Sequence, residues 1–281
     1  MDSLISTAWL AQHLGDADLL ILDASSHLPA AERDAATEFA AGHIPGARFL
    51  DLASFKDESS SVPSALPTGD QVAERLAELG YRPGQRIVIY DDSDVKTSAR
   101  AWFALRRAGV GPLALLDGGL AKWRAEGREL ATGDAHTNHD RPQHLTTSEA
   151  RVRTKAQMLN NIASGAEQVI DARDAERFTG ATIDTRHNLP GGHIPGSRHL
   201  FFRDLYNADG TFKGNDQLRD AFVGAKVDLD RPIVTTCGSG VTASVLLFAL
   251  HRLGIEDGAL YDGSWSEWGA DPDTPKATGT A

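Results

Sequence analysis

The chain contains an internal repeat, and this repeat limits the folds that it can adopt. Residues 42–47 read Gly-His-Ile-Pro-Gly-Ala, and residues 192–197 read Gly-His-Ile-Pro-Gly-Ser. An Asp-Gly pair followed by a tryptophan also occurs in each half, at Asp117–Trp123 and at Asp262–Trp268. Because several matches recur in the same order, the sequence indicates that one domain has been duplicated.

Each half alternates short apolar runs with helical patterns that stop at a glycine. The apolar runs are residues 19–24, 86–91, 169–172 and 232–237, and the helical patterns are residues 98–108 and 243–253. Such alternation is typical of a parallel sheet with helices on both faces. We therefore predict an α/β fold of two tandem domains, over residues 1–130 and 151–281, joined by a linker over residues 131–150.

The predicted linker is polar and contains three histidines, His136, His139 and His144. Histidines can bind metal ions, but no acidic or thiol ligand pattern accompanies these three. A solvated linker is therefore the favoured interpretation. We predict that the protein uses neither a metal nor a cofactor.

Composition excludes several classes of protein. Of the 281 residues, 28 are Lys or Arg and 39 are Asp or Glu, which gives a net charge of −11. An acidic chain without a basic run is a poor candidate for binding nucleic acid or an anionic membrane surface. A single cysteine rules out an internal disulfide, and no apolar run approaches the roughly 20 residues of a membrane span. Since the N-terminus has no signal-peptide pattern, we expect a cytoplasmic protein.

The single cysteine, Cys237, opens a loop over residues 237–242 that reads Cys-Gly-Ser-Gly-Val-Thr. An apolar strand pattern leads into this loop, and a helical pattern leads out of it. Backbone N–H groups at such a turn, together with the dipole of the following helix, favour a bound anion and stabilise a thiolate. Free cysteines are often buried structural residues, but this position points to a nucleophile.

The first half carries Asp91 where the second half carries Cys237. A carboxylate cannot replace a thiolate in sulfur chemistry, and two further aspartates nearby would repel an anion. We therefore expect the first domain to be catalytically silent and to supply one wall of a cleft. Because both halves carry the histidine of the repeated motif, we expect His43 and His193 to be structural.

With these motifs in the same order, the chain resembles the two-domain rhodanese-type sulfurtransferases over nearly its whole length. The resemblance implies two rhodanese-like domains and a Cys237 nucleophile that carries a persulfide. The cysteine loop is similar to that of family members that use 3-mercaptopyruvate, whereas members that use thiosulfate usually carry Cys-Arg-Lys-Gly-Val-Thr. Gly238 and Ser239 are neutral, so they suit a substrate whose charge lies away from its reacting sulfur better than the compact thiosulfate dianion.

The resemblance also implies roles for individual residues. Arg177 and Arg186 would bind the carboxylate and carbonyl of mercaptopyruvate, although without the resemblance both would be interpreted as solvated charges. Ser239 would take part in a catalytic Ser–His–acid arrangement, or its hydroxyl would instead cap the following helix. The backbone N–H groups that would hold the persulfide are those of Gly238, Ser239, Gly240, Val241 and Thr242.

The sequence departs from the family in the loop that would supply the histidine. Family members often read His-Met-Leu-Pro where this chain reads Ser-Ala-Leu-Pro, so Ser64 replaces the histidine. Ala53 stands where the acid is expected, and Asp51 could act only with a shifted backbone. What replaces the proton relay of the family stays open.

The predicted reaction moves sulfur from 3-mercaptopyruvate through a Cys237 persulfide to a thiol or cyanide, and it releases pyruvate. The expected partners are a small-molecule sulfur donor and a thiol acceptor such as thioredoxin or a low-molecular-weight thiol, and we expect a monomer. A thiosulfate sulfurtransferase and a persulfide carrier with weak turnover are the alternatives. A phosphatase of related fold is disfavoured, because the cysteine loop contains no arginine to bind phosphate.

Overall fold

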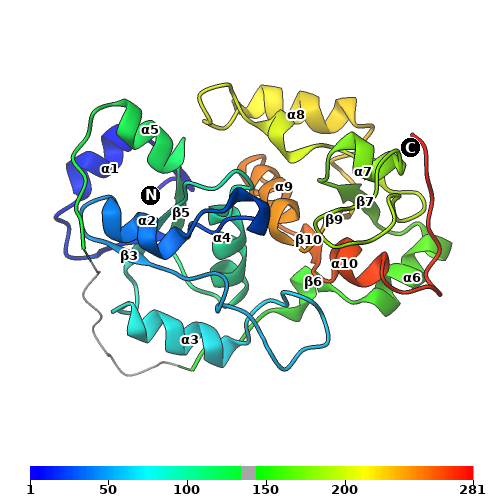
Figure 1. Cartoon of the computed structure of the whole chain (residues 1–281), viewed down its shortest axis with the longest axis horizontal. Coiled ribbons are helices and arrows are strands. Elements are labelled where there is room, and N and C mark those ends of the chain that lie inside the picture. Colours follow the sequence, from blue (N-terminus) through cyan, green and yellow to red (C-terminus); the bar gives the residue numbers. More distant parts are fainter. Residues whose placement is uncertain (134–143, 281) are drawn as a thin grey trace. The chain divides into compact units, whose positions relative to one another are not determined.

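The computed structural model describes residues 1–133 and 144–280, which belong to two compact units (Figure 1). The first unit consists of Met1–Asp57, Leu66–Ser148 and Asn207–Phe212, and the second of Glu58–Ala65, Glu149–Tyr206 and Lys213–Ala281. Residues 134–143 of the predicted linker, which include His136 and His139, lie outside the described residues.

The first unit is built on a parallel sheet with the strand order β1-β5-β4-β2-β3. Its strands are β1 (Leu4–Ile5), β2 (Leu19–Asp23), β3 (Ala47–Phe49), β4 (Arg86–Tyr90) and β5 (Leu113–Leu116). Its helices are α1 (Thr7–His13), η1 (Pro29–Ala31), α2 (Ala35–Ala41), α3 (Gly69–Glu78), α4 (Ser98–Arg107) and α5 (Gly119–Ala125). The central strands β2 and β4 are buried almost throughout, as their continuous apolar sequences require.

The second unit has a parallel sheet with the order β6-β10-β9-β7-β8. Its strands are β6 (Val152–Arg153), β7 (Gln168–Asp171), β8 (Arg198–His199), β9 (Ile233–Thr236) and β10 (Ala259–Tyr261). Its helices are η2 (Glu149–Arg151), α6 (Lys155–Ser164), α7 (Ala175–Thr179), η3 (Phe202–Leu205), α8 (Asn215–Gly224), α9 (Val241–Arg252) and α10 (Ser264–Trp268). Strand for strand, this is the order of the first unit, so the predicted duplication of a parallel α/β domain is confirmed.

Equivalent residues of the two repeats have equivalent surroundings. Trp123 and Trp268 are both buried, and each indole N–H donates at 2.8 Å to a backbone carbonyl that follows in the chain. His43 stacks on Phe39 with the ring centroids 3.9 Å apart, and its Nδ1 bonds the carbonyl of that phenylalanine. His193 makes the same two contacts with Phe178. The repeated motif therefore uses its histidine to hold the segment before β3 or β8 against the preceding helix, α2 or α7.

Helix α9 occupies the core of the second unit. Residues 242–250 are all buried, including the hydroxyl-bearing Thr242 and Ser244, because this helix packs against β9, β10 and η3. Among residues 1–133 and 144–280, none of the helices combines the length and the hydrophobicity that crossing a bilayer requires.

Candidate active site

Cys237 directly follows β9 and precedes α9, at the edge where the carboxyl ends of the parallel strands meet. Its side chain is only 2% exposed. Its backbone N–H donates to Ser264 Oγ at 3.2 Å, and its carbonyl accepts from the N–H of Trp265 at 3.0 Å. The Gly238 carbonyl accepts from the N–H of Ser266 at 2.8 Å. These three bonds to the start of α10 fix the backbone that carries the thiol.

The cysteine loop leaves a row of backbone donors open. Within the described part of the chain, none of the backbone N–H groups of residues 238–242 has a hydrogen-bond acceptor. Gly240 turns the chain into α9 at a φ of 79°, a left-handed conformation that glycine adopts at little cost. No side chain caps α9, so Ser239 does not cap this helix. Open N–H groups at the start of a long helix form a site for an anion.

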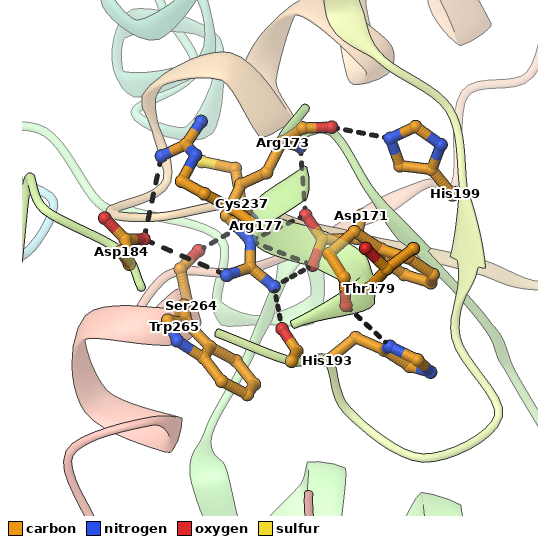
Figure 2. Close-up of polar contacts among 12 residues, drawn as sticks. Asp171, Arg173, Arg177, Thr179, Asp184, His193, His199, Cys237, Ser264 and Trp265 are labelled. Carbon is orange, nitrogen blue, oxygen red and sulfur yellow. Dashed lines mark hydrogen bonds and ion pairs between the residues drawn. The ribbon is translucent and has the colours of Figure 1, made fainter. Parts of the chain in front are cut away.

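Arg173, which sequence reasoning missed, lies buried beside this loop. Its guanidinium donates to both oxygens of Asp171 and to the carbonyl of Gly192 (Figure 2). The Cζ atom of this guanidinium lies 4.5 Å from the centre of the Trp265 ring. Burial opposes its charge, but the attraction of Asp171, Asp184 and Cys237 raises the pKa of Arg173.

Asp184 is fully buried and faces two guanidinium groups. Its Oδ2 lies 3.8 Å from Nη1 of Arg173 and 3.6 Å from Nη1 of Arg177, as the lines in Figure 2 show. Its Oδ1 accepts from the backbone N–H of Arg186 and from Nδ1 of His187, both at 3.1 Å. Burial opposes ionisation, but the hydrogen bond and charge of His187 and the charges of Arg177 and Arg173 lower the pKa of Asp184 to about 2. This side chain is therefore a carboxylate near neutral pH.

The two predicted arginines differ in their surroundings. Arg177 lies on α7, is 8% exposed and donates through Nε to Asp174 at 2.7 Å, so it is not a solvated charge. The Arg186 side chain is exposed, and its guanidinium has no hydrogen-bond partner among the described residues. Neighbouring groups that displace part of the water around this guanidinium, and then repulsion from Arg177 and Arg203, lower the pKa of Arg186. An anion held between these guanidinium groups would relieve that repulsion.

The ring of His187 lies against the cysteine loop. A Cβ placed on Gly238 would stand 2.5 Å from Cε1 of this ring and 3.3 Å from each ring nitrogen. Residue 238 therefore has to be glycine for the ring to occupy this position. Nδ1 bonds Asp184, whereas Nε2 has no hydrogen-bond partner among the described residues.

Sequence reasoning missed Arg173, Asp184 and His187, although weak signals for them were present. Asp184 and His187 stand two residues before and one residue after the predicted Arg186. Arg173 stands where the first repeat has Ser25, a difference that an alignment of the two halves reveals.

Ser64 stands where the family often has the histidine of its proton relay, and Asp51 is the nearby acid that could act only with a shifted backbone. Asp51 has other hydrogen-bond partners, and Ser64 has an unusual backbone conformation. Asp51 accepts hydrogen bonds from the backbone N–H of Ala53 at 2.9 Å and from the hydroxyl of Ser54 at 2.6 Å. Ser64 adopts a positive φ of 57°. The carboxylate of Asp51 is therefore occupied within its own turn.

Metal-ligating side chains do not gather at this site. Over residues 1–133 and 144–280, no three His, Cys, Asp or Glu side chains lie together in a way that could hold a metal ion. Of the linker histidines, His144 lies within the described residues, and its Nδ1 is 3.1 Å from a carboxylate oxygen of Asp70.

Comparison with known proteins shows which family the chain belongs to. The model of the rhodanese-like domain matches residues 6–126 and 154–271. The chain belongs to the rhodanese-like family. The 3-mercaptopyruvate sulfurtransferase of Escherichia coli K12 is 38% identical over 272 residues, which cover 96% of this chain and 96% of that protein. The mitochondrial thiosulfate/3-mercaptopyruvate sulfurtransferase 1 of Arabidopsis thaliana is 36% identical over 98% of this chain and 78% of its own length.

A solved structure shows the same rhodanese fold. The crystal structure of SseA from Escherichia coli, described as a 3-mercaptopyruvate sulfotransferase, matches this chain with a TM-score of 0.85. The match covers 94% of this chain and 99% of that one, at 34% identity. The family resemblance predicted from the repeat and the cysteine loop is therefore confirmed.

Proposed function

We propose that this rhodanese-like protein is a 3-mercaptopyruvate sulfurtransferase that works through a persulfide on Cys237. The observation that carries the proposal is the buried thiol at the start of α9, beside the open N–H groups of residues 238–242. The names of the Escherichia coli and Arabidopsis thaliana relatives support the same donor.

In the first half-reaction, the Cys237 thiolate attacks the sulfur of 3-mercaptopyruvate. The new S–S bond forms as the bond between that sulfur and C3 of the substrate breaks, and the electron pair of the broken bond passes to the pyruvate enolate. The N–H groups of Gly238, Ser239 and Gly240, with those of Val241 and Thr242, hold the terminal sulfur and its charge. Protonation of the enolate at C3 then gives pyruvate.

Arg186 and Arg177 bind the negatively charged carboxylate of the substrate. The neutral Gly238 and Ser239 offer no cation next to the nucleophile, whereas the two guanidinium groups repel each other and favour an anion between them. A carboxylate several bonds from the reacting sulfur suits this separation.

In the second half-reaction, a thiol or cyanide removes the outer sulfur and restores the thiolate. Thioredoxin or a low-molecular-weight thiol as acceptor, a monomeric state and a cytoplasmic location stay predictions from the sequence. So does a catalytically silent first domain, which the Asp91 carboxylate at the cysteine position supports.

A thiosulfate sulfurtransferase is the second candidate, because the Arabidopsis thaliana relative is named for both donors. The two candidates differ in kcat/KM for the two donors. A persulfide carrier would form the persulfide but release little pyruvate.

The test is steady-state kinetics of the wild type and of Cys237→Ser with both donors. We expect pyruvate release from 3-mercaptopyruvate to have the higher kcat/KM, and the substitution to abolish it together with thiocyanate formation from thiosulfate and cyanide. A preference for thiosulfate would reverse the choice of donor. Unchanged activity of Cys237→Ser would contradict the whole proposal.

A further inference from the structure

The proposed reaction needs a proton carrier near Cys237. The enolate that leaves after sulfur transfer must receive a proton at C3, and the substrate thiol must lose one. The loop at Ser64 carries no histidine that could serve both steps. The second unit does carry a histidine, His187, against the cysteine loop, on the segment between α7 and β8.

We propose that His187, oriented by Asp184, transfers this proton and takes the place of the histidine that the loop at Ser64 lacks. The inference rests on the proposed function and adds a residue to it. The first support is position: the ring lies against Gly238, the residue after the nucleophile, with Nε2 3.3 Å from where a Cβ on Gly238 would stand. The ring therefore lies beside the loop that would hold a substrate sulfur at Cys237.

The second support is the tautomer that Asp184 imposes. Its Oδ1 lies 3.1 Å from Nδ1 of His187, and its pKa of about 2 keeps it ionised. A carboxylate can only accept a hydrogen bond, so Nδ1 carries the hydrogen and Nε2 of the neutral ring is the basic nitrogen. The same carboxylate stabilises the imidazolium that forms when Nε2 takes a proton.

The third support is that Nε2 is not engaged and that the side chain is partly exposed. It has no hydrogen-bond partner among the described residues, and the side chain is 21% exposed. A hairpin turn holds the ring in place, because the backbone of Asp184 bonds that of Leu189 in both directions. The turn presents Arg186 and His187 together, one for the substrate carboxylate and one for its proton.

The proton balance closes without another reactant. As Cys237 bonds the substrate sulfur, the proton of the S–H group passes to Nε2 of His187, and the electron pair of the broken C–S bond passes to the enolate. Nε2 then returns this proton to C3, which gives pyruvate and leaves a persulfide anion on Cys237. Transfer from thiosulfate releases sulfite instead, and no carbon has to be protonated.

This difference between donors provides the test. We expect His187→Gln to lower kcat for pyruvate release from 3-mercaptopyruvate by about a hundredfold, the usual worth of general acid–base catalysis, with little change in KM. Thiocyanate formation from thiosulfate and cyanide by the same variant should stay within about twofold of the wild type, because it needs no such proton. Added imidazole should restore part of the mercaptopyruvate activity of His187→Ala.

A second variant moves the ring without removing it. Gly238→Ala places a Cβ 2.5 Å from Cε1 of His187, so the ring must shift, and the activity with mercaptopyruvate should fall more than that with thiosulfate. Gly224→Ala is the matched control, because a Cβ there meets nothing within 4 Å. His251→Gln is the control for the histidine, since His251 lies at the opposite end of α9 from the cysteine loop.

The outcomes separate this inference from the proposed function. A wild type without mercaptopyruvate activity overturns both. An active wild type with an equally active His187→Gln overturns the role of His187 alone. Equal losses with both donors also overturn it, because His187 would then only support the loop.

Discussion

The two repeats place very different groups at the same turn. In the first unit, the Asp91 carboxylate accepts from the backbone N–H of Ser93 at 2.9 Å and from that of Ser98, the first residue of α4, at 2.8 Å. In the second unit, the corresponding residue is Cys237, and the N–H groups of residues 238–242 have no acceptor within the described chain. The backbone N–H groups at this turn thus bind the protein's own carboxylate in the first repeat. In the second repeat the equivalent N–H groups stay open for an anion.

Moving the cysteine from position 237 to position 91 tests this comparison with the largest expected effect. A double variant, Asp91→Cys with Cys237→Ser, should show no sulfur transfer, at least about a thousandfold below the wild type. The reason is the surroundings of residue 91. Helix α4 starts only seven residues after Asp91, and the first unit carries no arginine where the second has Arg173. Donor assays with both substrates measure the outcome.

The control is Asp91→Cys alone, which should keep full activity because the Cys237 loop is untouched. It should lose about 1–3 kcal/mol of stability, since two buried N–H groups lose their acceptor. Sulfur transfer by the double variant would show that a cysteine at this turn suffices for activity.

A second difference lies two residues after β2 in the first unit and two residues after its equivalent, β7, in the second. Asp23 and Asp171 end these strands, and both are buried. In the first unit Ser25 donates its backbone N–H to Asp23, whereas in the second unit Arg173 donates its N–H and its guanidinium to Asp171. The second repeat therefore has a buried cation, Arg173, beside this aspartate, whereas the first repeat has the neutral Ser25 at the same position.

Replacing Arg173 tests how much this cation contributes to the stability of the protein. We expect Arg173→Ser, which copies the first repeat, to lower the free energy of unfolding by about 3–5 kcal/mol, because Asp171 and Asp184 then lack their buried partner. Denaturant unfolding measures this loss. Ser25→Ala is the matched control and should cost less, about 1 kcal/mol, because the hydroxyl it removes is neutral and accepts a hydrogen bond from the backbone N–H of Asp92. Similar losses in both variants would contradict the assignment of Arg173 as the partner of the two carboxylates.

The sequence predicted the parts that repeat, and the structure supplied the parts that differ. The matching motifs sufficed for the fold, the buried Trp123 and Trp268, and the place of Cys237. The contacts of Arg173 and His187 could not be read from the sequence, because residues 173, 184, 187 and 238 are brought together by tertiary packing. Arg177 was expected to bind substrate, but its bond to Asp174 and its burial depend on how α7 packs.

The smallest expected effect concerns the pH dependence of stability in the first repeat. Burial, only partly offset by hydrogen bonds from Ser25 and Tyr90, raises the pKa of Asp23 to about 6. An unfolded aspartate has a pKa of about 3.9, so this side chain contributes stability that is complete below about pH 4 and is lost as the pH rises through 6. By about pH 7.5 the loss amounts to about 3 kcal/mol.

Replacing Asp23 with asparagine removes this titration and keeps an oxygen that can accept from Ser25. We expect Asp23→Asn to exceed the wild type by up to about 3 kcal/mol in unfolding free energy at about pH 7.5, and to show little advantage near pH 4. Asp171→Asn is the matched control: near neutral pH it should destabilise the protein, because Arg173 loses its charged partner. If Asp23→Asn changes stability equally at both pH values, Asp23 does not titrate between them. The presence of Ser25 rather than an arginine beside Asp23 would then not affect the charge of this carboxyl.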